Sequence, residues 1–266
     1  MFEYVIERID TPALAIGYHL APWDEPAFGG RTAVIAELAL RRPEGAAKAF
    51  APFRTWCDAN AIMLVNCRLP HDQLAAAGFL ESQGFRFIEL NYRPTRRGLE
   101  QYLPDPAIRI ALADAADEGK IADMAAKIFA DSRLHADPEI DSRIGDRRYR
   151  GWASNAFRHS AQQVMKCVME GQIVGFMVVE APAPAERFWS LVGLAPGLAG
   201  QGLGRRVWQT MLAHHHAEKV TEVSTSISSH NSAVHNLYVG LGFRFPAPTM
   251  TFHWCPRGPI TMAAHA

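Results

Sequence analysis

The sequence predicts an α/β protein in which a mixed central sheet is flanked by helices. Three observations predict this class. Apolar strand-like runs alternate with amphipathic segments, glycines mark the ends of those segments, and a hairpin interrupts the alternation. The chain of 266 residues is long enough for one large domain or two modest ones. A Pro- and Arg-rich stretch over 91–110 divides the pattern, so we predict a smaller N-terminal α/β domain over 1–100 and a second domain over 101–266.

The first domain shows two helical and two strand-like segments in alternation. Helices are expected at 46–60 and 70–83, and strands at 61–67 and 85–92.

The second domain restarts with a strand at 107–112 and an amphipathic helix at 116–130. A further helix is expected at 149–160. The runs at 162–170 and 172–180 read as a hairpin, because Glu170-Gly171 is a turn signal between them. The remaining predicted elements are a strand at 187–194, a helix at 204–217, a strand at 220–227, a helix at 232–241 and a strand at 251–255.

Gly-Phe-Arg-Phe occurs twice, at 84–87 and at 242–245, each time after a predicted helix. The match is either chance or the trace of an α/β unit present in both halves, and the sequence leaves both interpretations open.

Composition excludes several classes of protein. The formal net charge is zero, which argues against a general nucleic-acid binder. The cysteines show no CxxC pairing, which argues against a zinc site or a disulfide framework; they are Cys57, Cys67, Cys167 and Cys255. No apolar run approaches the ~18 residues that span a bilayer, and the first ten residues are acidic where a signal peptide would be basic and then apolar. We expect a cytoplasmic protein with no nucleic-acid or membrane partner.

The stretch Gly193–Gln209, GLAPGLAGQGLGRRVWQ, carries the clearest functional signal. Its glycines lie between a predicted strand and a predicted helix, where bare backbone amides and the helix dipole favour an anion. Gly204 is followed by Arg205-Arg206 rather than Lys-Ser/Thr, which excludes an NTPase phosphate loop. The G-x-G-x-G spacing also differs from the G-x-G-x-x-G of dinucleotide binders. The alternative interpretation is a solvated surface turn with an exposed arginine pair.

A second signal lies downstream, at 230–243. Asn231 is suited to cap the helix that follows, and Gly242 is suited to end it. Tyr238 falls on the apolar face of this helix, so it is either functional or a packed core aromatic.

Together the two segments resemble the GCN5-related N-acetyltransferase (GNAT) superfamily, whose glycine loop binds the acetyl-CoA pyrophosphate and precedes N-x-x-A-x-x-x-Y-x-x-x-G-F. The resemblance covers most of 108–255 and implies the GNAT fold, acetyl-CoA as acyl donor and Tyr238 as general acid. Ala199 stands where Arg or Gln is usual, and the alanine after Asn231 comes earlier than in the commonest spacing. The implied cofactor-binding residues are Val192, Gly193, Leu194, Ala199, Gly200, Gln201, Gly202, Leu203, Gly204, Arg205 and Asn231.

Other stretches resemble one branch, the dTDP-fucosamine (dTDP-4-amino-4,6-dideoxygalactose) acetyltransferases. They are the segments 23–31, 80–94, 128–140 and 149–157. This resemblance implies a nucleotide-linked 4-amino sugar as the amine substrate. It makes Arg133 and His135 candidate substrate residues, although Arg133 could equally hold its loop by a salt bridge.

The chemistry that this resemblance implies is direct attack of an amine on the thioester. Backbone N–H groups near Gly193 and Leu194 are candidates for stabilising the oxyanion, and Tyr238 for protonating the thiolate. His135, Asp137 and Glu180 remain alternatives for a general base. The run 214–216 is all histidine, but consecutive helical residues diverge, so no metal is expected. A peptide N-acetyltransferase and a non-catalytic acyl-CoA-binding module remain alternative functions, and a homodimer is left open.

Overall fold

The computed structural model describes residues 5–198 and 200–262. By their contacts, these residues form two compact units. Unit 1 comprises 5–91, 131–148 and 247–262, and unit 2 comprises 92–130 and 149–246. The chain therefore changes unit after residues 91, 130, 148 and 246. This division differs from the single predicted break near residue 100, because a break in composition does not reveal later returns of the chain.

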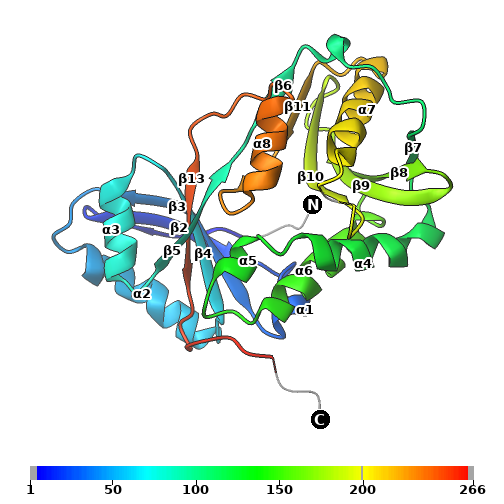
Figure 1. The fold of residues 1–266 in the computed structure, drawn as a ribbon. Helices are drawn as coiled ribbons and strands as arrows, with labels where there is room; N and C mark the ends of the chain where they lie inside the picture. The colour runs from blue at the N-terminus through cyan, green and yellow to red at the C-terminus, as the bar shows by residue number, and fades with distance from the viewer. Residues whose placement is uncertain (1–4, 199, 263–266) are drawn as a thin grey trace. The chain divides into compact units, whose positions relative to one another are not determined.

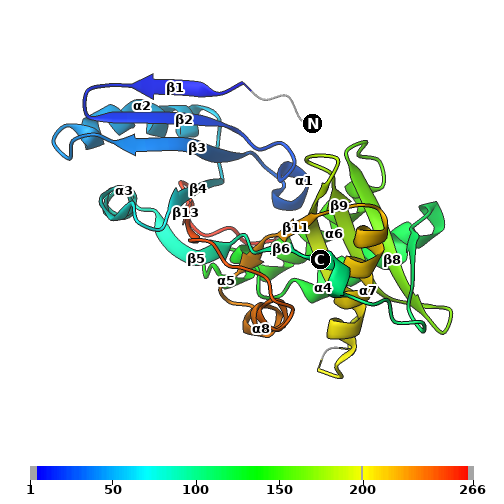
Figure 2. The same ribbon diagram turned by 90° about the horizontal axis from the view of Figure 1, so that it is seen from above.

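Six strands of unit 1 form a mixed sheet in the order β1-β2-β3-β4-β13-β5 (Figure 1 and Figure 2). Its strands are β1 (Glu7–Asp10), β2 (Leu14–Leu20), β3 (Thr32–Leu40), β4 (Leu64–Pro70), β5 (Arg86–Tyr92) and β13 (Thr249–Trp254). Its helices are α1 (Glu25–Phe28), α2 (Ala46–Ala59), α3 (Leu74–Ser82), α5 (Arg133–Ala136) and the first half of α6 (Ser142–Ala156). No element was predicted before residue 46, so β1–β3 and α1 are additions to the sequence interpretation.

The core of unit 1 lies between one face of this sheet and α2 and α3. Phe50 and Phe53 of α2 and Leu80 of α3 are fully buried against alternate residues of β2, β3, β4 and β13. This is the pattern expected when one sheet face packs on helices, because strand side chains alternate between faces. Strand β4 begins three residues later than the predicted strand, since Ala59 ends α2 and residues 60–63 form a turn around Ala61 (φ 54°).

Unit 2 has a second mixed sheet with the order β6-β11-β10-β9-β8-β7 (Figure 1). Its strands are β6 (Thr95–Arg97), β7 (Arg109–Leu112), β8 (Gln162–Met169), β9 (Gln172–Glu180), β10 (Glu186–Leu194) and β11 (Glu222–Thr225). The unit also contains the short strand β12 (Ile227–Ser228), which is not part of this sheet. Its helices are α4 (Glu118–Ile128), the second half of α6, α7 (Leu203–Ala217) and α8 (Ser232–Gly240), with 3-10 turns at Leu99–Gln101 and Ala115–Asp117.

Helices cover both faces of the unit 2 sheet. Phe176 and Val178 of β9 pack into the cluster formed with α4 and α6, whereas their neighbours Met177 and Val179 pack into the cluster formed with α7 and α8. This arrangement confirms the predicted mixed sheet flanked by helices. The hairpin β8–β9 is also confirmed, with Glu170 (φ 51°) and Gly171 (φ 74°) in the left-handed conformation that a two-residue turn requires.

Strands β6 and β13 each belong to a different unit from the element that precedes them in the chain. Strand β6 follows β5 in the chain but pairs antiparallel with β11 in unit 2. Strand β13 follows the second Gly-Phe-Arg-Phe segment, in unit 2, but pairs antiparallel with both β4 and β5 in unit 1. The last predicted strand therefore completes the sheet of unit 1 rather than that of the second predicted domain.

Candidate functional site

The site is built around β10, which has different neighbours along its two halves. Glu186–Trp189 pairs parallel with Glu222–Thr225 of β11. Beyond Trp189 no further pair with β11 forms among the described residues, while pairing with β9 continues to Leu194. A register shift at Ser190 marks the parting, as β-bulges do when they re-aim a strand. One edge of Val192–Leu194 is therefore left without a ladder partner in the described chain, and such an edge can bind an extended ligand by strand addition.

Gly193 is required by a close approach rather than by its backbone angles. A Cβ at this position would lie 1.9 Å from Cδ1 of Ile128, the last residue of α4. The end of α4 thus lies directly against the end of β10. A side chain at position 193 would require the Ile128 side chain to move, so this close contact favours glycine.

The glycine loop after β10 is open. Leu198 N donates to Ala195 O at 3.2 Å, and Gly197 (φ 84°) takes the position of this turn that requires a positive φ. Gly200 (φ 80°) and Gly202 (φ 76°) are also left-handed, and a Cβ on either would meet no atom within 4 Å. Ala199 lies outside the described residues.

Gly202 is the N-cap of α7, and no side chain among the described residues caps the helix. The first-turn N–H groups of α7 therefore face this loop without a side-chain acceptor, as at helix starts that bind anions. Gln201 supports the loop from within, because its Nε2 donates to Gly197 O at 3.1 Å.

The two arginines of the predicted phosphate site have other partners. Arg205 donates to the carbonyl of Gly240, at the end of α8, at 2.9 Å. Arg206 forms an ion pair with Asp105 at 2.6 Å. The loop thus offers backbone N–H groups, whereas both guanidinium groups hold neighbouring segments of unit 2.

Helix α8 has the predicted ends. Oδ1 of Asn231 accepts from Val234 N at 3.0 Å and caps the helix. At its other end Gly242 (φ 71°) is left-handed, and Phe243 N returns to Tyr238 O at 3.0 Å.

Tyr238 is buried in the core of unit 2, with its ring edge-on to Phe243. Burial raises the pKa of its phenol to about 12, and the neighbouring Trp208 and Thr225 side chains oppose that shift. Thr225 forms the last ladder pair between β11 and β10, and its hydroxyl donates to Trp189 O at 2.8 Å. The Tyr238 hydroxyl is therefore next to the point where β10 and β11 part. In the described chain, the buried Nε1 of Trp208 has no hydrogen-bond partner.

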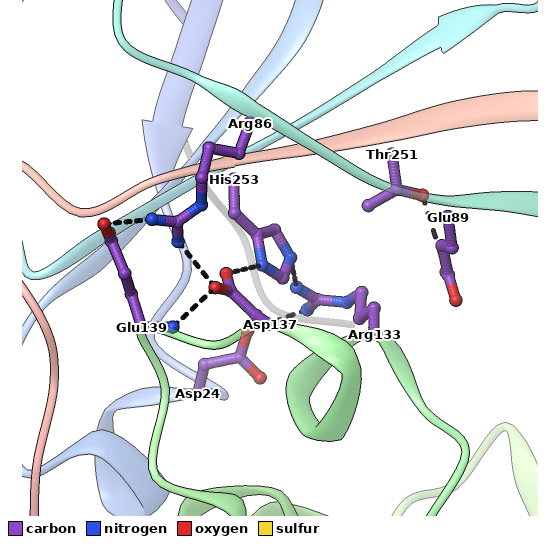
Figure 3. A network of polar contacts seen from close by, with 8 residues as sticks. All are labelled: Asp24, Arg86, Glu89, Arg133, Asp137, Glu139, Thr251 and His253. Atoms are coloured by element: carbon purple, nitrogen blue, oxygen red, sulfur yellow. Dashed lines mark hydrogen bonds and ion pairs between the residues drawn. The ribbon is translucent and has the colours of Figure 1, made fainter. Parts of the chain in front are cut away.

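Arg133, one of the two candidate substrate residues, lies in unit 1 within a network of polar contacts (Figure 3). Arg133 contacts His253 Nε2 at 2.6 Å and Asp24 at 3.8 Å. Asp137, fully buried, pairs with Arg86 at 2.6 Å and with His253 Nδ1 at 2.8 Å. Burial lowers the pKa of His253 to about 4. The ring is thus neutral and accepts from Arg133, so its Nδ1–H donates to Asp137.

His135, the other candidate substrate residue, is fixed in the same unit. Its two ring nitrogens contact Ser132 at 2.7 Å and Asp146 at 3.1 Å. Arg133 and His135 therefore group with unit 1, whereas the glycine loop and Tyr238 group with unit 2. Glu180, the third candidate base, accepts from Gln162 at 2.8 Å.

The histidine run on α7 includes one buried ring. His215 accepts from Nε1 of Trp189 at 3.1 Å and contacts Glu218 at 3.2 Å, and burial lowers its pKa to about 4. Within the described ranges, no group of three or more His, Cys, Asp or Glu residues is placed to hold a metal ion. Over the same residues, no helix is both long and apolar enough to cross a membrane.

Part of the chain is similar in sequence to known acetyltransferases. Residues 123–243 match the model of the acetyltransferase (GNAT) family. A stretch of 96 residues is 32% identical to mycothiol acetyltransferase of Frankia alni and covers 32% of this chain. That stretch spans 29% of the relative's length.

Solved structures share the fold at low sequence identity. A GCN5-related N-acetyltransferase from Sphaerobacter thermophilus superposes with a TM-score of 0.65 at 12% identity, over 94% of this chain and 83% of that one. A tandem GNAT protein from the clavulanic acid biosynthesis pathway superposes with a TM-score of 0.60 at 14% identity, over 92% of this chain and 79% of that one. The segment that matches the acetyltransferase (GNAT) family model runs from α4 to the end of α8, so it includes β10, the glycine loop and Tyr238.

Proposed function

We propose that the protein is an acetyl-CoA-dependent N-acetyltransferase acting on the primary amine of a small molecule. The observation that carries the proposal is the junction of β10 and α7. An unpaired strand edge leads into a loop of left-handed glycines at an uncapped helix start, with the Tyr238 hydroxyl next to the point where β10 leaves β11.

The residues at this junction fit the acyl donor. Gly200 and Gly202 leave open space above the loop, so the diphosphate can approach the backbone N–H groups of Leu203 and Gly204 closely. The free edge of Val192–Leu194 offers hydrogen-bonding groups to the amides of the pantetheine arm. Arg205 and Asn231 support the proposal indirectly, since both stabilise α8.

The proposed reaction forms a C–N bond and breaks a C–S bond. A neutral amine attacks the thioester carbonyl, and N–H groups near Gly193 and Leu194 stabilise the oxyanion. The amine proton leaves to water, so Asp137 and His135 are not required as bases. With the pKa of Tyr238 raised to about 12, its phenol stays protonated at neutral pH. Because the pKa of a thiol is lower, at ~8.5, full transfer of the phenol proton to the thiolate is unfavourable. We therefore infer that Tyr238 chiefly donates a hydrogen bond to the sulfur.

The acceptor class is proposed separately from the reaction. A nucleotide-linked 4-amino sugar is the first acceptor to test, because of the branch-like segments at 23–31 and 128–140. The second acceptor to test is that of a mycothiol acetyltransferase, because part of the chain is similar to the Frankia alni enzyme of that name.

The test is release of free thiol from acetyl-CoA by the full chain, with both acceptors beside a polyamine and a lysine peptide. We expect turnover on a small amine and its loss in Tyr238→Phe. Turnover on the peptide alone would overturn the small-molecule assignment, and a folded protein that binds no CoA would overturn the proposal as a whole.

A further inference from the structure

Two lysines on α4 face the start of the glycine loop. Lys120 and Lys127 are seven positions apart, with Asp123 and Met124 between them, so these side chains share one face of the helix. Together with Pro196 they line a surface depression of about 390 Å³. Pro196 belongs to the turn Ala195–Leu198 that opens the glycine loop.

The charge of this depression is positive. The Asp123 carboxylate is paired with Arg150, so it does not neutralise the lysines. Nζ of Lys120 donates to the uncharged Gln172 side chain at 3.4 Å, and the nearby Asp117 carboxylate, which also interacts with Lys120, is paired with Lys166. In the part of the chain that the structure describes, Lys127 forms no hydrogen bond or ion pair. Two ammonium groups therefore face solvent beside a loop whose own arginines, Arg205 and Arg206, are engaged elsewhere.

Packing fixes Lys127 close to the end of β10. Its neighbour Ile128 fills the space that a side chain at Gly193 would occupy. The opposite face of α4, with Ile121 and Ala125, is buried in the core of unit 2. Rotation of the helix away from the loop would expose that face, so the lysines are held on the loop side.

We propose that Lys120 and Lys127 bind a phosphate group of the acyl donor. This inference rests on the proposed function and deepens it. Lysine suits a flexible, exposed phosphate because its ammonium acts as a point charge without a fixed fork. The diphosphate and the 3′-phosphate of CoA share the required chemistry, as does the diphosphate of a nucleotide-linked acceptor. The position of Pro196 at the start of the glycine loop assigns the lysines to the donor.

The test measures equilibrium binding of CoA to the full chain by isothermal titration calorimetry. We expect Lys127→Ala to weaken binding about tenfold, and Lys127→Glu to weaken it further. Both effects should shrink as salt is raised, because the lysines are exposed. Lys48→Glu is the matched control, since Lys48 is an exposed lysine in the first turn of α2 and its replacement changes net charge equally.

Shorter ligands identify the phosphate. Pantetheine has none, so its weaker binding should be the same in wild type and Lys127→Glu. If Lys127→Ala still weakens dephospho-CoA binding, the lysine contacts the diphosphate, and if the difference disappears it contacts the 3′-phosphate.

Several results would overturn the inference. The first is an unchanged CoA affinity in Lys127→Glu. The second is an equal loss of affinity for pantetheine in that variant, or an equal loss of CoA affinity in Lys48→Glu. The third is a variant that loses affinity for the nucleotide-linked acceptor but not for CoA. A wild-type protein that is folded but binds no CoA would instead contradict the proposed function, so the two failures are distinguishable.

Discussion

Strand β3 of unit 1 and strand β10 of unit 2 are built alike. Each has nine residues, pairs antiparallel with the strand before it, and pairs parallel with the next strand over its first four residues only. In each the register with the antiparallel neighbour shifts at the fifth residue, Ala36 or Ser190. Each is followed by a helix whose N-cap is a left-handed glycine, Gly45 (φ 82°) or Gly202 (φ 76°).

The next helices, α3 and α8, also end alike. Phe85 N returns to Leu80 O at 3.0 Å, as Phe243 N returns to Tyr238 O. Gly84 (φ 86°) and Gly242 (φ 71°) take the same left-handed position. The repeated Gly-Phe-Arg-Phe therefore marks the same structural position in both units, which favours a repeated α/β unit over chance.

The loop between β3 and α2 and the loop between β10 and α7 differ in whether their backbone N–H groups are hydrogen-bonded within the unit. In unit 1 the N–H groups of Arg41 and Arg42 both bond to Ala13 O, at 2.9 and 3.1 Å, so the short loop is closed onto the β1–β2 turn. In unit 2 the loop is three residues longer and open over its glycines. Leu80 of α3 takes the position that corresponds to Tyr238 of α8, five residues before the phenylalanine in each unit. One scaffold thus carries a candidate site in unit 2 and a loop closed by backbone hydrogen bonds in unit 1.

The largest expected effect is acid destabilisation, which both units should show. His253 in unit 1 faces Asp137, Arg133 and Arg68, and His215 in unit 2 faces Glu218, His214 and Arg187. Both have a pKa of about 4 in the folded state, below the usual value of ~6.5, so the unfolded chain binds more protons. The free energy of unfolding should fall by up to about 3 kcal/mol per histidine between pH 6.5 and 4.

Urea unfolding at several pH values between 7.5 and 4 measures this loss. His215→Gln and His253→Gln should each flatten the pH dependence relative to wild type. An unchanged slope in either variant would show that the ring does not stay neutral in that unit.

The second prediction compares the matched residues of α8 and α3. Tyr238→Phe should lower kcat roughly hundredfold with little change in KM, because the phenol acts after the donor is bound. Leu80→Met conserves volume in unit 1 and should leave kcat unchanged. Steady-state kinetics with thermal denaturation measures both, and equal losses in the two variants would remove the functional distinction between the units.

The third prediction concerns the eighth residue of each strand. Gly193→Ala forces Ile128 away and should cost about 1–3 kcal/mol of stability and weaken CoA binding. Unit 1 carries Ala39 at the matching place, and Ala39→Gly should leave CoA binding unchanged. Chemical denaturation and calorimetry test the pair. Full CoA affinity in a folded Gly193→Ala would show that α4 need not contact β10 closely.

The smallest expected effect distinguishes the two loops. Gln201→Ala removes the bond to Gly197 O and should weaken CoA binding about threefold, which corresponds to ~0.7 kcal/mol. Arg42→Ala removes a 3.3 Å bond to Pro12 O in the closed loop and should leave CoA binding unaltered. The reverse ranking of these two affinities would place the donor in unit 1.

Local features of this fold could be predicted from sequence because local physics determines them. The turn at Glu170-Gly171, the cap at Asn231 and the end at Gly242 depend on neighbouring residues only. The partners of β6 and β13 could not be predicted, because strand patterning gives the buried face but not the neighbour. The engagement of Arg205 and Arg206 with Gly240 and Asp105 was also hidden, since both contacts join distant segments.

The insertion of β13 between β4 and β5 has a consequence for synthesis of the chain. Strand β5 ends at Tyr92, whereas β13 begins at Thr249. At ~5–20 residues per second, a ribosome needs roughly 8–30 s to make the intervening chain. During that interval the nascent first unit has a gap in its sheet, and the edges of β4 and β5 that later pair with β13 are open. Such edges bind other chains readily, so newly made protein is exposed to aggregation until its last strand emerges.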